Sequence, residues 1–286
     1  MHELRTRGAE WLAGGCRAIV VTVTEARGSA PREAGTRMLV DAGRAIGTIG
    51  GGHLELKAID EARELLRRAD LAPRERHYPL GPALGQCCGG AVTLALAPLD
   101  RAALAAWPDI EPRFHLQLYG AGHVGRAIAR ALVPMNVRVD WIDEREEEFP
   151  ASLSDASGAA WPAHIRRISV DAVEAETRDA PAGACYLVLT HRHDLDLRIT
   201  EAILRRGDFG FLGLIGSRTK RQRFVHRFEA LGIAPSTIAG MTCPIGLPGI
   251  EGKEPETIAA SVVAQLLLVS SAGHATLKGP KPAEPR

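Results

Sequence analysis

The sequence predicts an α/β protein with an N-terminal α/β domain and a C-terminal Rossmann-like domain that has a mainly parallel sheet. Three observations lead to this prediction. Short apolar runs typical of buried strands alternate with amphipathic runs typical of helices. A glycine cluster, Gly120 to Gly125, follows one apolar run and opens a helical pattern. Pro108 and Pro112 precede that apolar run and indicate a domain boundary.

Residues 1–99 are predicted to form the first domain. Its helices are expected at 3–13 and 53–69, where apolar side chains recur at helical spacing. Its strands are expected at 16–25, 36–40, 45–49, 74–78 and 91–97. Glycine and proline are frequent in the segments 27–35 and 79–90, which are therefore expected to be loops.

Residues 100–113 are predicted to be a helix and a linker, and residues 114–272 the Rossmann-like domain. The strands of this domain are expected at 115–119, 137–142, 165–170, 185–190 and 209–215. Its helices are expected at 123–132, 195–206, 216–231 and 256–269. The Lys- and Pro-rich residues 273–286 are expected to be a disordered tail.

The glycine cluster has the spacing of a dinucleotide-binding turn. Gly120, Gly122 and Gly125 form the pattern GxGxxG between a predicted strand and a predicted helix. Such glycines allow a tight turn, close approach of a pyrophosphate, and close packing of helix on strand. Asp143 closes the next predicted strand about 20 residues later, where a carboxylate can bind a ribose hydroxyl. The alternative is a tight turn with no ligand, because a fold does not fix a function.

The composition argues against several classes of partner. The formal net charge is +1 and aromatic residues make up 5% of the chain, so nothing indicates a nucleic acid. No apolar run approaches the ~20 residues of a membrane span, and the N-terminus has no signal-peptide core. Five cysteines at irregular spacing do not form a disulfide framework. We therefore expect a reduced, cytoplasmic protein that binds neither nucleic acid nor a membrane.

Two adjacent cysteines in a glycine-rich loop indicate a site for ligand binding or sulfur transfer. Gln86, Cys87 and Cys88 precede two glycines, which leave the backbone and the sulfur atoms accessible to a ligand. Thiolates bind soft metals and take part in sulfur transfer. The alternative is a pair of small side chains in the apolar core, which is what we expect of Cys16 and Cys185 within predicted strands.

Two further glycine-rich loops are candidates for binding an anionic, flat ligand. Arg32 lies in the first loop, and Gly51, Gly52 and His53 lie in the second. Backbone N–H groups and a guanidinium are typical ligands of phosphate. The alternative is an ordinary pair of loops with solvated arginines.

A basic helix start is a second candidate for binding an anion. Ser217 and Arg218 follow a predicted strand, and more cations crowd the first two turns of the helix that begins there. Cations are unfavourable at a helix N-terminus unless an anion lies nearby, and a bound phosphate would supply one. The alternative is a solvated basic face.

The loop THRHDLD at 190–196 follows a predicted strand at the end of the sheet where ligands bind. His191 and His193, with the acids beside them, could supply metal ligands. The spacing departs from the HxHxDH pattern of metallo-hydrolases, because the acid comes one place early and the closing His is missing. A ligand-facing loop without a metal is the alternative.

Seven motifs in one order resemble the xanthine dehydrogenase accessory protein (XdhC) family. They are GSAPREAGTRMLV, GTIGGGHLE, GQCCGG, LYGAGHVG, THRHDLD, GLIGSRTKR and CPIGL…PETIAASVVAQ, and they extend from residue 28 to residue 265. In this sequence Cys87 or Cys88 matches the cysteine region that the family links to cofactor binding. Arg32 and the loop at 50–52 match its signature loops. The segment after Ile245, LPGIEGKEPE, departs from the usual spacing.

The resemblance implies a function as well as an N-terminal accessory domain. It implies a chaperone that binds the molybdenum cofactor and assists its sulfuration and its insertion into a xanthine dehydrogenase-type hydroxylase. Cys87 and Cys88 would then be possible molybdenum ligands. The implied partners are the hydroxylase apoenzyme, a cysteine desulfurase as sulfur donor, and a second copy in a homodimer.

Two enzymatic alternatives remain open at this point. The GxGxxG turn with Asp143 would suit an NAD(P)-dependent oxidoreductase, although no catalytic His or Lys for hydride transfer is identifiable. His191 and His193 would suit a metallo-hydrolase. The chain shows no convincing triad or acid–base pair, which favours a chaperone over a catalyst.

Overall fold

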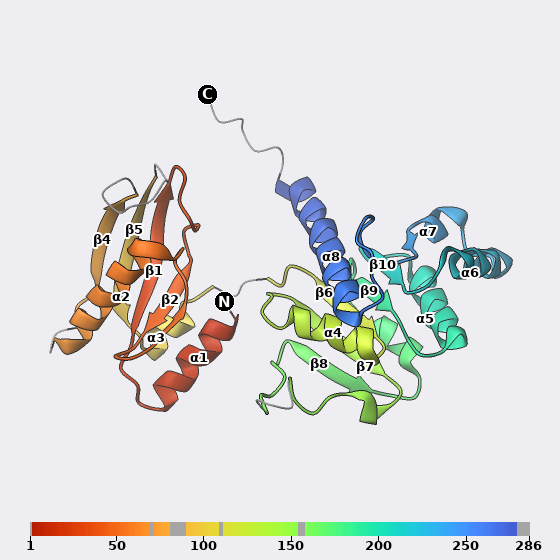
Figure 1. Cartoon of the computed structure of the whole chain (residues 1–286), viewed down its shortest axis with the longest axis horizontal. Helices are drawn as coiled ribbons and strands as arrows, with labels where there is room; N and C mark the ends of the chain where they lie inside the picture. Colours follow the sequence, from red (N-terminus) through yellow and green to blue (C-terminus); the bar gives the residue numbers. More distant parts are fainter. Residues whose placement is uncertain (1, 69–70, 81–89, 109–110, 154–157, 279–286) are drawn as a thin grey trace. The chain divides into compact units, whose positions relative to one another are not determined.

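The structure is a computed structural model that describes residues 2–68, 71–80, 90–108, 111–153 and 158–278. The chain forms two compact units, Met1–Ile110 and Glu111–Arg286. Figure 1 shows the helices and strands of each unit. Both units combine helices with one sheet, which confirms the predicted α/β class.

The N-terminal unit is built on a five-stranded antiparallel sheet in the order β3-β2-β1-β5-β4. The strands are β1 (Ile19–Arg27), β2 (Arg37–Val40), β3 (Ala45–Gly47), β4 (Arg74–Pro79) and β5 (Ala91–Pro98). The helices are α1 (His2–Ala13), α2 (Gly52–Arg67) and α3 (Arg101–Ala105). Strand β1 is central because Ile19, Val21 and Val23 pack in the same cluster as α2, whereas Val20 packs with Leu4 of α1.

The C-terminal unit contains a six-stranded parallel sheet in the order β11-β10-β9-β6-β7-β8. The strands are β6 (His115–Tyr119), β7 (Arg138–Asp143), β8 (Ile165–Ser169), β9 (Cys185–Val188), β10 (Phe211–Leu214) and β11 (Met241–Thr242). Counted along the chain, this order is the 3-2-1-4-5-6 order of a Rossmann fold. The predicted Rossmann-like domain with a mainly parallel sheet is confirmed. Ligands of such sheets bind outside the carboxyl ends of the strands, here beside β6 and β9.

Helices cover both faces of this sheet (Figure 1). The pair α4 (His123–Leu132) and α8 (Pro255–Lys278) packs together, and Ile128 and Val262 belong to one core cluster. On the other face lie α5 (His193–Arg206), α6 (Arg218–Ala230), α7 (Pro235–Ala239) and the 3-10 helix η3 (Val173–Asp179). A second 3-10 turn, η2, spans Glu146–Glu148. Both sheet faces are therefore buried, which explains the uninterrupted apolar strands β9 and β10.

Helix α8 differs from two predictions. It continues to Lys278, so residues 273–278, which were expected in the disordered tail, are helical. The segment 270–278 contains Ala and Leu and no proline, and therefore does not stop the helix. In addition, Pro255–Ala272 is long and apolar enough to cross a membrane by length and composition alone, although no apolar segment of that length was expected. Val262 and Leu266 are buried in the core, as in a core helix of a globular protein.

Candidate functional site

The glycine-rich loops of the N-terminal unit meet at one end of its sheet. A Cβ atom at Gly50 would lie 2.6 Å from Cγ of Pro31, so the two predicted anion-binding loops touch. A Cβ atom at Gly90 would overlap the carbonyl oxygen of Arg27 and lie 2.9 Å from that of Ser29. Gly90 ends the loop that carries the two cysteines. The described parts of three separate motifs are thus in direct contact.

The carboxylate of Glu55 fixes the glycine loop before α2. Its Oε2 atom accepts hydrogen bonds from Thr48 Oγ1 at 2.5 Å and from the backbone N–H groups of Ile49 and Gly51, both at 3.1 Å. Gly51 precedes α2 with a φ of 77°, which glycine adopts readily, and no side chain caps the helix. The start of α2 therefore presents backbone N–H groups and the positive end of the helix dipole to an anion.

Some of the predicted ligands of this loop cluster are described by the structure and others are not. Arg32, Gly52 and His53 are exposed beside the start of α2. Gln86, Cys87 and Cys88 lie outside the described residues. The backbone N–H of Leu80 donates to the carbonyl oxygen of Gly90 at 2.7 Å, so the described residues on either side of 81–89 are hydrogen-bonded to each other.

The GxGxxG turn of the C-terminal unit uses its three glycines differently. A Cβ atom at Gly120, where φ is 120°, would overlap the carbonyl oxygen of Leu189. One at Gly125 would overlap the carbonyl oxygen of Gly120, because α4 lies close to the end of β6. A Cβ atom at Gly122 would meet nothing within 4 Å. Two glycines are thus required by packing, and only Gly122 has an open side that a ligand could approach.

Asp143, the predicted ribose ligand, is buried and already engaged by the protein. Its carboxylate accepts hydrogen bonds from Arg145 Nε and the Arg145 backbone N–H at Oδ1, and from Arg145 Nη2 and Ala121 N at Oδ2, all between 2.7 and 3.0 Å. Burial alone would raise the pKa of Asp143, but these hydrogen bonds and the guanidinium charge outweigh it and lower the pKa. A ribose hydroxyl would have to displace Arg145 to reach the carboxylate.

One cation of the basic helix start is paired inside the protein. Lys220 Nζ lies 2.5 Å from Asp196 Oδ2 and 2.8 Å from the carbonyl oxygen of Ile215. Asp196 also accepts from Thr190 N and Thr190 Oγ1, at 2.9 and 2.7 Å. A Cβ atom at Gly216 would lie 2.5 Å from Cδ of Lys220, so this glycine makes room for the lysine. The pair ties the loop after β9 to the loop after β10.

The other predicted residues of α6 remain at its start. Ser217 caps the helix, because its side chain accepts a hydrogen bond from Lys220 N at 3.1 Å. Arg218 is exposed at the carboxyl edge of the sheet. An external anion is not needed to balance every cation at this helix start, because Asp196 already forms an ion pair with Lys220.

The histidines of the loop after β9 are not gathered with further metal ligands in the structure. His191 Nε2 lies 3.6 Å from Glu144 Oε1, and His193 is exposed in the first turn of α5. Within the described ranges, no group of three or more His, Cys, Asp or Glu side chains could hold a metal ion. A metal site at His191 and His193 remains a prediction.

The thiols of the described cysteines all have a raised pKa. Burial raises the pKa of Cys185 in β9 to about 12 and also raises the pKa of Cys243, which lies after β11. Cys16 precedes β1 and is partly exposed, so its predicted place within a strand is wrong. Burial and the nearby Asp41 carboxylate raise the pKa of Cys16 as well.

Two residues that organise these sites, Glu55 and Arg145, were not predicted from the sequence. Glu55 could have been found as an acid in the first turn of a helix that follows three glycines, a position that favours backbone donors. Arg145 follows Asp143 by only two residues, but its pairing depends on the turn at the end of β7. No sequence pattern indicates that turn.

Comparison with known proteins gives matches over most of the chain. A family model described as the XdhC Rossmann domain matches residues 116–266, and one described as the XdhC and CoxI family matches residues 11–78. The chain is 29% identical over 273 residues to the uncharacterized protein YqeB of Escherichia coli K12, covering 93% of this chain and 46% of YqeB. It is 26% identical over 282 residues to the molybdenum cofactor insertion chaperone PaoD of the same organism, covering 91% of this chain and 86% of PaoD.

A solved structure shares the fold. A crystal structure titled as a xanthine dehydrogenase from Bacillus halodurans superposes with a TM-score of 0.73 at 18% identity. The match covers 96% of this chain and 98% of that one. The Rossmann-domain model alone spans more than half of the sequence. The chain therefore belongs to the XdhC family.

Proposed function

We propose that this protein is a chaperone that binds the molybdenum cofactor and inserts it into a molybdenum hydroxylase of the xanthine dehydrogenase type. Family membership and the named function of PaoD support the proposal. The observation that carries it is the contact of the loop at 29–32 with Gly50, which lies just before α2, and with Gly90. These segments come from separate parts of the sequence. Packing within the protein requires glycine at positions 50 and 90, whereas Gly51 has an open side that a ligand could approach.

The residues at this place fit the chemical groups of such a cofactor. The uncapped start of α2, with Gly51, Gly52 and His53, offers hydrogen-bond donors to a phosphate or to the polar edge of a pterin. Arg32 adds an exposed guanidinium. Cys87 and Cys88 would supply soft thiolate ligands, which suit molybdenum, and Gln86 lies beside them. When bound, the cofactor supplies the molybdenum and the dithiolene sulfurs that a hydroxylase needs.

In the C-terminal unit, Gly122 and Arg218 are the residues that we propose for contact with an anionic group. Gly122 has an open side, and Arg218 is exposed at the carboxyl edge of the sheet. Ser217 and Asp143 contribute indirectly, because each is already hydrogen-bonded within the protein. The engaged state of Asp143 does not favour the NAD(P)-dependent oxidoreductase, which predicts a saturable fluorescence change when NADH or NADPH is titrated.

The proposal has finer parts that rest on the family resemblance. The chaperone would assist sulfuration of the bound cofactor, with a cysteine desulfurase as the sulfur donor. It would act as a homodimer in the cytoplasm. Pull-down with a purified cysteine desulfurase and sedimentation analysis test these parts separately.

Cofactor retention tests the central claim. The protein is purified from cells that make molybdenum cofactor, and molybdenum is measured by mass spectrometry together with the pterin released by oxidation. Cys87→Ala, Cys88→Ala and the double variant should lose molybdenum, whereas the control Cys16→Ala should retain it. If the double variant holds as much molybdenum and pterin as the wild type, the thiolate role is refuted. If the wild type releases no pterin, the cofactor-binding role itself fails.

A further inference from the structure

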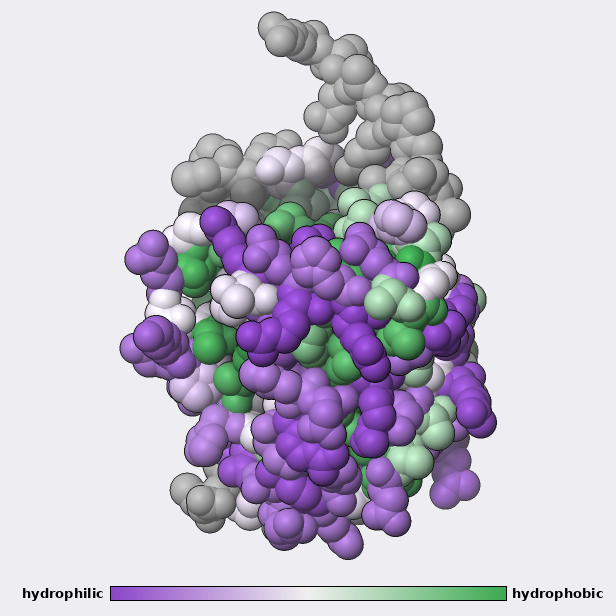
Figure 2. All heavy atoms as spheres, turned by 90° about the vertical axis from the view of Figure 1, so that its right-hand side faces the viewer, coloured by the Kyte–Doolittle hydropathy of each residue, from purple (hydrophilic) through white to green (hydrophobic). Residues whose placement is uncertain are grey.

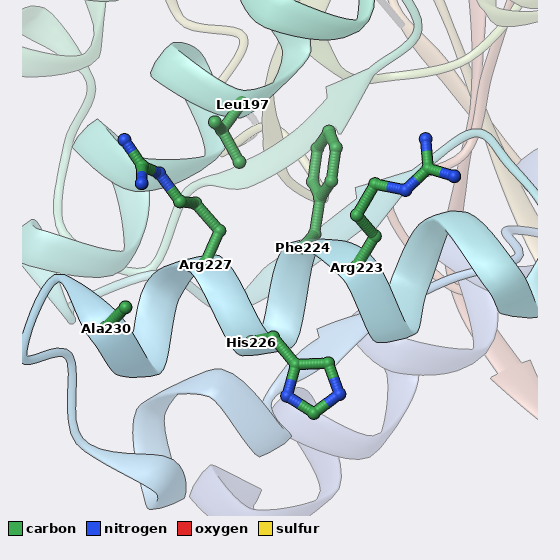
Figure 3. Close-up of a pocket in the computed structure, with 6 residues that line it drawn as sticks. All are labelled: Leu197, Arg223, Phe224, His226, Arg227 and Ala230. Atoms are coloured by element: carbon green, nitrogen blue, oxygen red, sulfur yellow. The ribbon is translucent and has the colours of Figure 1, made fainter.

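Helices α5 and α6 form an open groove on the surface of the C-terminal unit. Its volume is about 470 Å³, and it is lined by Leu197, Arg223, Phe224, His226, Arg227 and Ala230. In Figure 3, Leu197 of α5 lies opposite Phe224 of α6, and the two arginines project on either side of Phe224. His226 points away from them (Figure 3). The groove therefore has an apolar floor between two cations.

The charge of α6 is not balanced by the rest of the described protein. The helix contains five cations and one acid, Glu229, in a chain whose net charge is +1. Lys220 is paired with Asp196. No ion pair is formed within the described residues by the arginines of α6, namely Arg218, Arg221, Arg223 and Arg227.

Elsewhere many exposed arginines have a carboxylate partner. Examples are Arg7 with Glu10 at 3.0 Å and Arg68 with Glu64 at 2.6 Å. Figure 2 faces the side of the C-terminal unit on which α6 lies and shows small hydrophobic areas between hydrophilic side chains. The combination of unpaired cations with an apolar floor is typical of a surface that meets an acidic partner.

The spacing of the two arginines defines the shape of that partner. Arg223 and Arg227 are one helical turn apart, which places their backbones about 6 Å apart along the axis. We propose that the α5–α6 groove docks an acidic segment of a partner protein that inserts one apolar side chain between two carboxylates. The apolar side chain would contact Leu197 and Phe224, and each carboxylate would pair with one guanidinium.

A protein segment suits this groove better than a nucleic acid does. Single-stranded nucleic acids bind by stacking their bases on exposed aromatic rings. Phe224 is only 5% exposed, so its ring cannot serve as a stacking platform. An apolar side chain needs only a contact with the floor, and the flanking charges then determine its orientation. The groove is formed by residues other than the proposed cofactor ligands, so docking and cofactor binding can be tested separately.

A labelled peptide tests the proposal with the full-length protein. The probe is a fluorescein-labelled peptide of 14 residues with one Leu between glutamates, and binding is followed by fluorescence polarisation at 150 mM salt. Arg223→Glu/Arg227→Glu should weaken binding at least tenfold. The matched control Arg7→Glu/Arg68→Glu changes the net charge equally at exposed positions of the other unit, one in α1 and one directly after α2, and it should bind within twofold of the wild type. Replacing the central Leu of the peptide by Ser should also weaken binding at least tenfold.

Other results would overturn the proposal. Equal loss in both double variants would mean that the peptide responds to net charge rather than to the groove. Stronger competition by duplex DNA or by anionic lipid vesicles than by unlabelled peptide would assign the groove to those ligands. A wild-type dimer in sedimentation that Arg223→Glu/Arg227→Glu dissociates would assign it to a second copy. Because both variants should retain molybdenum equally, a failure of cofactor binding remains distinguishable from a failure of docking.

Discussion

Removal of Lys220 should destabilise the carboxyl edge of the parallel sheet. Lys220→Met keeps a long apolar side chain beside Gly216 but deletes the ammonium that lies 2.5 Å from Asp196. Asp196 is 1% exposed, so its charge would stay in the interior without a counter-ion. Loss of one partner of a buried ion pair typically costs about 3–5 kcal/mol. The two hydrogen bonds from Thr190 persist, so we expect the lower end of that range, about 3 kcal/mol.

The assay is hydrogen exchange measured by mass spectrometry on peptides that cover residues 187–200 and 212–225. A change of about 3 kcal/mol corresponds to roughly hundredfold faster exchange of amides that open with this edge. Asp196→Asn should have a similar effect, and the double variant should cost little more than either single one, because the partners act together. Arg218→Met is the control, since Arg218 is exposed on the same helix. A cost below about 1 kcal/mol, or additive effects in the double variant, would refute the ion-pair argument.

Three further predictions follow from the geometry. Gly125→Ala should cost about 2–3 kcal/mol in urea unfolding because its Cβ overlaps the backbone, whereas Gly122→Ala should change stability by less than about 0.5 kcal/mol. The pKa of Asp143 is lowered in the folded state, so its pairing with Arg145 stabilises the protein above about pH 4 and is lost as the pH falls through the folded pKa. Asp143→Asn should therefore be less stable than the wild type at pH 7 and lose less stability between pH 5 and pH 3. Iodoacetamide at pH 7.5 should leave Cys185 unmodified in the folded protein and label it in urea, as peptide mapping would show.

The elements that the sequence predicts well are those with a clear period. The strands β6, β7, β9 and β10 are short apolar runs between helical patterns, and their parallel arrangement follows from that alternation. The strand β11 has two residues and α7 has five, which is too short for any period to show. The extension of α8 was missed because the basic and Pro-rich character of the last residues dominated the prediction.

The residue types of the candidate sites could be predicted from the sequence, but the contacts between these residues could not. Glycine-rich loops and adjacent cysteines can be recognised from residue types. The contact between Gly50 and Pro31, however, joins positions 19 residues apart through the packing of α2 against the sheet. Asp143 has the spacing of a ribose ligand, and only the fold shows that Arg145 occupies both of its oxygens. Spacing along the chain predicts the position of a residue on its strand or helix. The packing of neighbouring elements determines what its side chain contacts.

The basic start of α6 illustrates this limit, because its cations face in different directions. At 100° per residue, Arg218 and Arg223 are separated by about 140° around the helix. Lys220 is directed into the protein to Asp196, and Arg223 and Arg227 flank the groove with α5. Arg218 alone lies next to the capping Ser217 at the carboxyl edge of the sheet. The cations of this helix start therefore serve one buried ion pair and two separate surfaces. Substitutions at Arg218 should affect anion binding without affecting the groove, and substitutions at Arg223 and Arg227 should do the reverse.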